Sequence, residues 1–141
     1  ALRQLYQAII IDHGRAPRHG GPLPGATHEA TADNPLCGDQ VTLRLIVDGD
    51  VVREVAFEGH GCTLSRAAAS LLASRLPGTA VPDARILADR FAAFVREPPD
   101  SPVPSDLGDL AAFAGVREFK SRQDCATLVV EALLGALRSP R

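Results

Sequence analysis

The sequence lacks an excess of positive charge and a long apolar run, two features that mark partners of nucleic acids or membranes. Its 15 Lys and Arg residues stand against 17 Asp and Glu residues, which gives a formal net charge of −2. A protein that mainly binds nucleic acid or an anionic membrane surface carries a basic patch. No apolar run is long enough to cross a bilayer. We therefore expect no nucleic-acid partner and no membrane partner.

The sequence also lacks an even number of cysteines, since it has three. An odd number of cysteines cannot all pair within one chain. The sequence shows no signal-peptide pattern, and we find neither an internal repeat nor a low-complexity segment. These absences predict a reducing, cytoplasmic setting. The length of 141 residues is typical of one domain, which we expect to span residues 1–141.

The three cysteines carry the main functional signal. Cys37 lies in the string NPLCGD, Cys62 in GHGCT and Cys125 in CATL, each at a predicted boundary between a loop and a regular element. A thiol at such a boundary is accessible, and its pKa can be lowered there. With the carboxylate of Asp39, three thiolates would make a four-ligand set for a divalent metal such as zinc. Bound in this way, the site would be anionic.

Two other interpretations of these residues stay open at this point. The cysteines lie much further apart than the ligands of a zinc finger, and a free cysteine often behaves as a small buried hydrophobe. Asp39 can instead form a local Asx turn. Glycines beside Cys37 and Cys62 favour access over core packing.

Periodicity and turn residues predict the secondary structure. The run 41–47 and the run 51–57 flank Asp48-Gly49-Asp50, which predicts an antiparallel hairpin. Apolar residues at helical spacing and Pro or Gly boundaries predict the helices. The other expected elements are a helix over 2–13, an irregular surface loop over 14–25, a short strand over 26–32, helices over 63–76, 83–96 and 125–137, a loop over 98–104 and a helical turn over 107–114.

These elements predict an α+β fold, a small antiparallel sheet with helices packed on one face. Cys37 is expected on a tight turn, and Asp39 on the same turn. Cys62 and Cys125 are each expected at the N-terminus of a helix, where free N–H groups and the helix dipole stabilise a thiolate. The metal would lie at the exposed end of the sheet.

The motifs resemble the iron-sulfur scaffold proteins of the IscU/NifU type, and most closely the SufU branch. The segment between Cys62 and Cys125 is similar to the insertion of SufU-type proteins. Asp124 stands where IscU-type scaffolds carry a histidine ligand. The resemblance spans nearly the whole chain and rests on LYQ (5–7), DH (12–13), PR (17–18), NPLCGD (34–39), FEGHGC (57–62), LGDL (107–110), GV (115–116) and Arg122 with CATL (125–128).

The resemblance implies that Cys37, Asp39, Cys62 and Cys125 bind Zn²⁺. It also implies that the chain accepts sulfur, as persulfide, from a PLP-dependent cysteine desulfurase of the SufS type and relays it to downstream cluster assembly proteins. The chain would then act as a sulfurtransferase-like sulfur carrier. Cys37 is the expected catalytic acceptor, because a cysteine on a turn is the easiest of the three to release.

The resemblance leaves several alternatives. The same cysteines would hold a transient [2Fe-2S] cluster for delivery to apo-proteins, or the zinc would only support the fold.

Some residue roles also stay open. Asp124 can replace Asp39 as a metal ligand, and its charge would disfavour thiolates unless it points away. Arg122 would steady the anionic site or the docked partner, or lie free in solvent. We leave His13 and His60 outside the metal set. Gly14, Lys120 and Asp124 depart from the family pattern.

Overall fold

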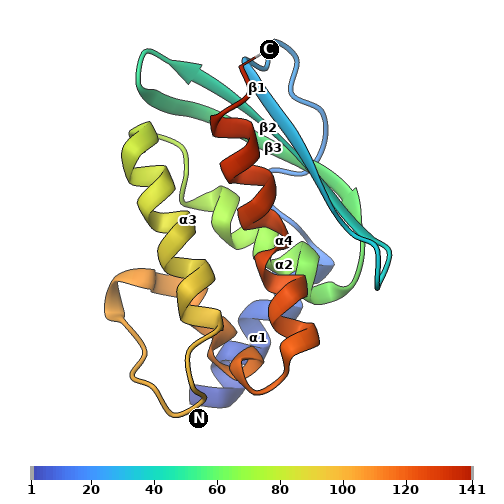
Figure 1. The fold of residues 1–141 in the computed structure, drawn as a ribbon, viewed down its shortest axis with the longest axis vertical. Coiled ribbons are helices and arrows are strands. Elements are labelled where there is room, and N and C mark those ends of the chain that lie inside the picture. Colours follow the sequence, from blue (N-terminus) through green and yellow to red (C-terminus); the bar gives the residue numbers. More distant parts are fainter. Residues whose placement is uncertain (1, 141) are drawn as a thin grey trace.

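A three-stranded antiparallel sheet in the order β1-β2-β3 forms one layer of the computed structural model, which describes residues 2–140 (Figure 1). The strands are β1 (His28–Asn34), β2 (Asp39–Asp48) and β3 (Val51–His60). The predicted hairpin around Gly49 is confirmed, and this glycine has the positive φ of 64° that a tight hairpin turn requires. β1 lies two residues further along the chain than the strand predicted over 26–32.

The helices cover one face of this sheet (Figure 1). α2 and α4 pack directly on the strands, and α1, α3 and η1 pack against these two helices or against one another. The predicted fold, a small antiparallel sheet with helices on one face, is confirmed. The helices are α1 (Leu2–Arg15), α2 (Thr63–Ser74), α3 (Val81–Val95), the 3₁₀ segment η1 (Ser105–Glu118) and α4 (Lys120–Leu137).

The core side of β2 extends as far as the candidate site. Burial alternates along this strand, so Val41, Leu43 and Leu45 face the helices and are at most 4% exposed. Asp39 lies two residues before Val41, so the same alternation places it on the core side, and its exposed fraction is also 4%. Asp39 is therefore the first residue of a strand and not, as predicted, part of the turn that holds Cys37.

The start of α4 differs from the prediction. We expected a helix from Cys125, but α4 begins at Lys120, so Cys125 lies in its second turn. The segment before Cys125 has no apolar periodicity that would have revealed it, yet it is rich in Lys, Arg and Gln, which favour helix. No glycine or proline interrupts residues 116–134. The N-cap residue Phe119 offers no capping side chain, which removes the other usual signal.

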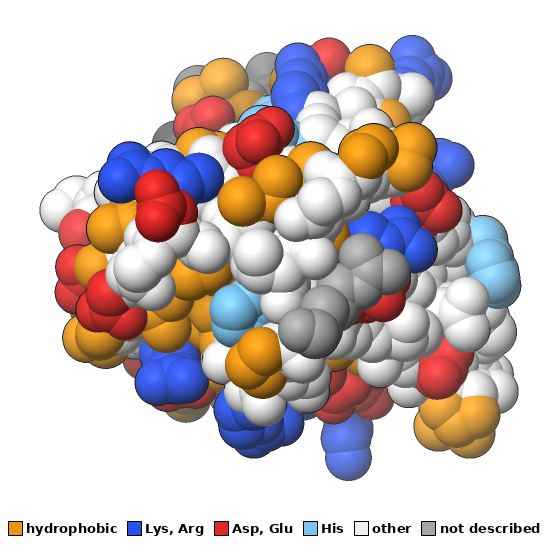
Figure 2. All heavy atoms as spheres, turned by 90° about the horizontal axis from the view of Figure 1, so that it is seen from above, with side chains coloured by type: hydrophobic (Ala, Val, Ile, Leu, Met, Phe, Trp, Pro, Cys, Tyr) orange, Lys and Arg blue, Asp and Glu red, His pale blue; other side chains and the backbone are white. Residues whose placement is uncertain are grey.

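The face of the molecule seen in Figure 2 carries no large patch of one charge sign. Positive and negative side chains are interspersed on the face seen from above in Figure 2. Within residues 2–140, none of the helices combines the length and the apolar character needed to cross a membrane. The cysteines are therefore a better guide to the site than the charge distribution.

His13 ties the end of α1 to α2. Its Nδ1 lies 2.7 Å from the hydroxyl oxygen of buried Ser70, which also accepts the backbone N–H of Arg18 at 2.8 Å. This contact agrees with our leaving His13 outside the metal set. Burial lowers the pKa of His13, and the positive charge of Arg18 lowers it further, while Asp12 and Asp109 oppose the shift.

We expect the pKa of His13 in the folded protein to lie below about 6.5, the value of an unperturbed histidine. The pKa should rise in Arg18→Gln, which removes a positive charge, and stay unchanged in Arg53→Gln on the β2–β3 hairpin. Because the folded pKa is the lower one, His13 contributes its full stability above pH 6.5 and loses it as pH falls through the folded pKa. NMR titration of the ring measures the value. An Arg18→Gln protein with an unchanged His13 pKa would contradict this account.

Arg117 is a buried cation without a carboxylate partner in the described contacts. It is 7% exposed, and its guanidinium donates to the carbonyl oxygens of Ala114, Ser101 and Pro99, each at 3.0 Å. It also lies 5.1 Å from the ring centroid of Phe94. This side chain therefore fastens the proline-rich loop that joins α3 to η1.

Arg117→Ala should destabilise the fold by about 3 kcal/mol, because several buried carbonyls lose a charged donor at once. The free energy of unfolding in urea measures the loss. Arg90→Ala removes an exposed ion pair with Asp106 and serves as the matched control, with an expected cost below about 1 kcal/mol. Equal losses in the two variants would show that the buried hydrogen bonds of Arg117 contribute no more to the free energy of unfolding than an exposed ion pair does.

Candidate metal centre

Cys37 lies in the four-residue loop that joins β1 to β2. Asn34 begins this loop, since its side-chain oxygen accepts the N–H of Leu36 at 3.2 Å and its carbonyl accepts the N–H of Gly38 at 2.9 Å. Gly38 has a positive φ of 74°, which returns the chain into β2. The predicted tight turn is confirmed. Cys37 is exposed, and its neighbour Leu36 is 94% exposed.

Cys62 is the N-cap residue of α2, as predicted. Its Sγ accepts the N–H of Ser65 at 3.4 Å, so the sulfur lies against the positive end of the helix. Asp39 approaches the same turn from β2. One carboxylate oxygen accepts the N–H of Cys62 at 3.2 Å, and the other accepts the hydroxyl of Ser65 at 2.5 Å and lies 3.6 Å from the Cys62 sulfur.

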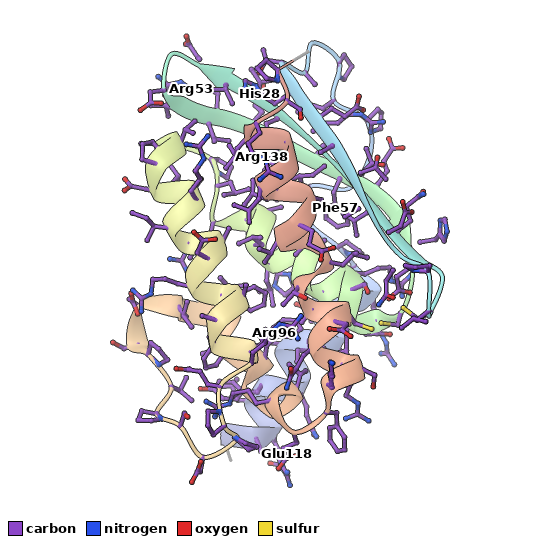
Figure 3. All side chains as sticks on the ribbon, in the orientation of Figure 1. His28, Arg53, Phe57, Arg96, Glu118 and Arg138 are labelled. Carbon is purple, nitrogen blue, oxygen red and sulfur yellow. The ribbon has the colours of Figure 1, made fainter. Side chains whose placement is uncertain are left out.

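Cys125 reaches the centre from α4. The hydroxyl of Ser65 lies 3.4 Å from the carbonyl oxygen of Cys125, which links this turn of α4 to the first turn of α2. One ligand atom from each of Cys37, Asp39 and Cys125 lies within 4.8 Å of the other two. In Figure 3 the sulfur atoms gather beside the end of the sheet. Segments that are far apart in the sequence thus bring two sulfurs and one carboxylate together. The Cys62 sulfur lies outside this mutually close group and is joined to it by its 3.6 Å contact with Asp39.

The groups that shift the pKa values of Cys125 and Asp39 include no positively charged side chain. Burial raises the pKa of the Cys125 thiol, and the neighbouring Cys62 and Asp39 raise it further. Burial alone would also raise the pKa of Asp39, but hydrogen bonds from Ser65, Cys37 and the Cys62 backbone outweigh it, and the pKa is lowered. Asp39 therefore stays an anion. A divalent cation among these groups would favour the thiolate forms, and three sulfurs with one oxygen suit zinc.

Comparison with known proteins identifies the family. The model of the NifU-like N-terminal domain matches residues 5–126. The chain belongs to this family. It is 36% identical over 137 residues to the iron-sulfur cluster assembly scaffold protein IscU of Streptococcus pyogenes serotype M1. The aligned region covers 97% of this chain and 85% of that protein. It is 38% identical over 136 residues to the zinc-dependent sulfurtransferase SufU of Bacillus subtilis strain 168, with 94% and 88% covered.

Solved structures show the same fold. A putative iron-sulfur cluster assembly scaffold protein for the SUF system, from Fervidobacterium islandicum AW-1, superposes with a TM-score of 0.84 at 25% identity, covering 97% of this chain and 99% of that one. The N-terminal NifU-like protein of Brucella abortus gives a TM-score of 0.85 at 26% identity, with 97% and 94% covered. The predicted resemblance to the IscU/NifU scaffold family is therefore confirmed.

Two glycines of the FEGHGC motif keep space for neighbouring atoms. A Cβ on Gly59 would lie 2.1 Å from the carbonyl oxygen of Gln40, so any side chain would separate β2 from β3. A Cβ on Gly61 would lie 2.7 Å from Asp39 Oδ1. Neither glycine has a positive φ among the residues described. These glycines are thus needed for the close approach of neighbouring atoms.

Three further residues near the centre lie outside the proposed ligand set and make contacts of their own. His60 is the exposed last residue of β3 and pairs with Gln40 in the ladder. Asp124, the alternative ligand, is engaged by Arg96 of the α3 C-cap at 3.1 Å. Arg122 stacks on Phe119, with 4.5 Å between its guanidinium carbon and the ring centroid. Sequence reasoning missed Ser65, which no motif singled out.

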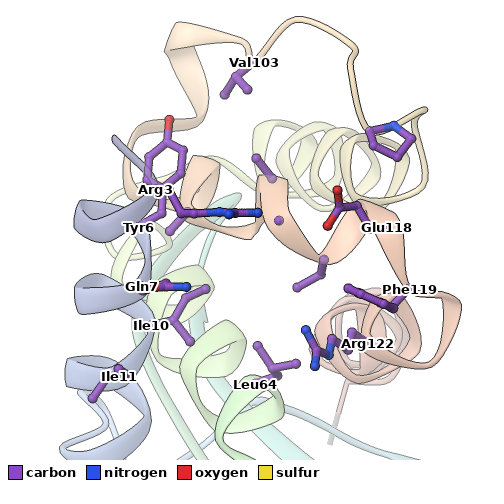
Figure 4. Close-up of a pocket in the computed structure, with 15 residues that line it drawn as sticks. Arg3, Tyr6, Gln7, Ile10, Ile11, Leu64, Val103, Glu118, Phe119 and Arg122 are labelled. Atoms are coloured by element: carbon purple, nitrogen blue, oxygen red, sulfur yellow. The ribbon is translucent and has the colours of Figure 1, made fainter. Parts of the chain in front are cut away.

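An open groove leads from the start of α1 to the first turn of α2. Figure 4 shows Tyr6 and Ile10 of α1 on one side and Phe119 and Arg122 on the other. The groove has a volume of about 920 Å³. Leu64 closes it at the first turn of α2, two residues after Cys62. A partner seated there would contact the first turn of α2, which Cys62 caps.

Gly61→Ala should weaken zinc binding by about tenfold, because the new methyl group displaces the Asp39 carboxylate, and changes around metal ligands typically cost 10–100-fold in affinity. Chelator competition measures the affinity. Gly115→Ala is the matched control, since a Cβ there meets nothing within 4 Å. Unchanged zinc affinity in Gly61→Ala would contradict the placement of Asp39 in the ligand set.

Proposed function

We propose that this protein is a zinc-dependent sulfur acceptor of iron-sulfur cluster assembly. The supporting observation is the convergence of Cys37, Asp39 and Cys125 within 4.8 Å, with Cys62 joined to the same carboxylate. Membership of the NifU-like N-terminal family supports a role in cluster assembly. The relative named zinc-dependent sulfurtransferase SufU supports the more specific role, because it matches 94% of this chain.

The proposed zinc ligands are Cys37, Asp39, Cys62 and Cys125. Each comes from a different element: the β1–β2 loop, the first residue of β2, the N-cap of α2 and the second turn of α4. Zinc in this site would hold the thiolates deprotonated and blunt their nucleophilicity until one is released. Asp39 has its own hydrogen bonds from Ser65 and the Cys62 N–H, which fix the carboxylate before any metal binds.

Cys37 is the proposed acceptor. Its loop is exposed and belongs to no helix, so the thiolate can leave the site without unfolding a helix. Its sulfur then attacks the terminal sulfur of a persulfide on the donor enzyme. The donor's sulfur–sulfur bond breaks, the donor cysteine leaves as thiolate, and a persulfide forms on Cys37 with no net oxidation or reduction.

The donor in this proposal is a PLP-dependent cysteine desulfurase of the SufS type. A donor that presents a persulfide must bring it to the exposed end of the sheet, where Cys37 and Leu36 protrude. The groove that ends at Leu64, two residues after Cys62, offers apolar surface for the docked enzyme. From Cys37 the sulfur would pass to downstream cluster assembly proteins.

Metal analysis and desulfurase turnover test this function together. We expect one zinc per chain in anaerobically purified protein, and a marked rise in the turnover of a SufS-type desulfurase when the protein is added. Cys37→Ala should abolish the rise while the protein stays folded, because the loop is exposed. His60→Ala, beside the site but outside the ligand set, is the matched control and should behave like the wild type.

Two outcomes would contradict the proposal. A Cys37→Ala protein that no longer folds would favour a purely structural zinc. A Cys37→Ala protein that still raises turnover and still takes up sulfur, detected by mass spectrometry, would exclude Cys37 as the acceptor.

A second candidate is a scaffold that carries a transient [2Fe-2S] cluster to apo-proteins. The relative named as an IscU scaffold, at 36% identity over 97% of this chain, favours it. Cluster-carrying protein would contain iron and sulfide after anaerobic purification and would have little effect on desulfurase turnover. Asp124 favours the zinc role instead, since it stands at the position of the histidine ligand of IscU-type scaffolds and is bound to Arg96.

A further inference from the structure

One arginine outside the ligand set holds the turn of α4 that carries Cys125. Arg96 is the C-cap residue of α3, and its guanidinium reaches across to α4 (Figure 3). It donates to the side-chain oxygen of Gln123 at 3.2 Å, to the carboxylate of Asp124 at 3.1 Å and to the hydroxyl of Thr127 at 3.1 Å. These contacts lie on both sides of Cys125 in the chain.

The start of α4 has little other support. Its N-cap residue makes no capping hydrogen bond, and residues 120–122 are exposed. Burial along α4 begins only at Ala126. Cys125 therefore lies where the exposed first turn of the helix meets its packed part. Gln123 extends the connection inward, because its amide donates to the carbonyl oxygen of Arg117, the buried arginine of η1.

The contact with Asp124 also restrains a competing carboxylate. Asp124 directly precedes Cys125 in α4, so it is the carboxylate nearest in sequence to a group that already contains Cys37, Cys125 and Asp39. Arg96 pairs with this carboxylate at the side of α4 that faces α3. The pair is partly exposed, with 44% and 36% of the two side chains accessible, and a pair of this kind adds little to the stability of the fold. The pair matters through the position that it gives to Asp124 and to this turn of α4.

We propose that Arg96 is a positioning residue of the metal centre. It fixes Cys125 for metal binding by clamping residues 123–127 of α4 to α3, and it keeps Asp124 out of the ligand set, which leaves Asp39 as the oxygen ligand. The inference rests on the proposed metal-binding function. It gives α3, part of the segment between Cys62 and Cys125, a direct role at a site to which it contributes no ligand.

Zinc affinity, measured by chelator competition, tests the clamp. Arg96→Ala should bind zinc about tenfold more weakly than the wild type, the lower end of the usual effect of residues that orient metal ligands. Arg90→Ala is the matched control, because it removes another exposed arginine–aspartate pair of α3, with Asp106, and should stay within about twofold of the wild type. Equal affinities of Arg96→Ala and wild type would overturn the proposal.

A double-substitution cycle separates positioning from general loosening. If Arg96 acts through Cys125, Arg96→Ala should change zinc affinity by no more than about twofold in a Cys125→Ser background. A full tenfold loss in that background would overturn the proposal, because the effect would not depend on Cys125. Asp124→Asn should bind zinc within about twofold of the wild type, while Asp39→Asn should lose far more. A large loss in Asp124→Asn would instead make Asp124 a ligand.

The outcomes distinguish this inference from the proposed function. If the wild-type protein binds no zinc, the proposed function fails before Arg96 is tested. If the wild-type protein binds zinc and raises desulfurase turnover but Arg96→Ala does the same with equal affinity, only the clamp fails.

Discussion

The buried carboxylate of Asp39 is the interaction on which the rest of the site depends. It lies on the core side of β2, receives the N–H of Cys62 and the hydroxyl of Ser65, and so joins the sheet to the N-terminus of α2. An ionised group at 4% exposure is tolerated only with such partners. The hydrogen bonds that satisfy Asp39 also bring the sulfur of Cys62 and the turn of Cys125 toward it.

The division of labour among the three cysteines follows from the elements that hold them. Cys62 is fixed by the cap of α2, and Cys125 by a helix packed on the sheet, whereas Cys37 lies on an exposed hairpin loop. If these cysteines and Asp39 bind zinc as we propose, Cys37 is the ligand that could be released while the other three stay in place. In a NifU-like domain this asymmetry suits sulfur transfer, because the released thiolate would be the one that a partner reaches first.

Much of the fold could be predicted from the sequence because its signals are local. The hairpin at Gly49, the N-cap position of Cys62 and the turn of Cys37 each follow from residues within a few positions of one another. Asp39 was assigned to the turn because its burial depends on the register of β2, and the start of α4 was missed because polar residues there carry no apolar period. Ser65 and Arg96 act through contacts made only in three dimensions, which no spacing reveals.

X-ray absorption at the zinc edge is the measurement that tests the central claim most directly. The account predicts one zinc per chain bound by three sulfurs and one oxygen, with the oxygen contribution perturbed in Asp39→Asn and unchanged in Asp124→Asn. A zinc with fewer than three sulfur ligands, or an oxygen shell that depends on Asp124 and not on Asp39, would contradict it.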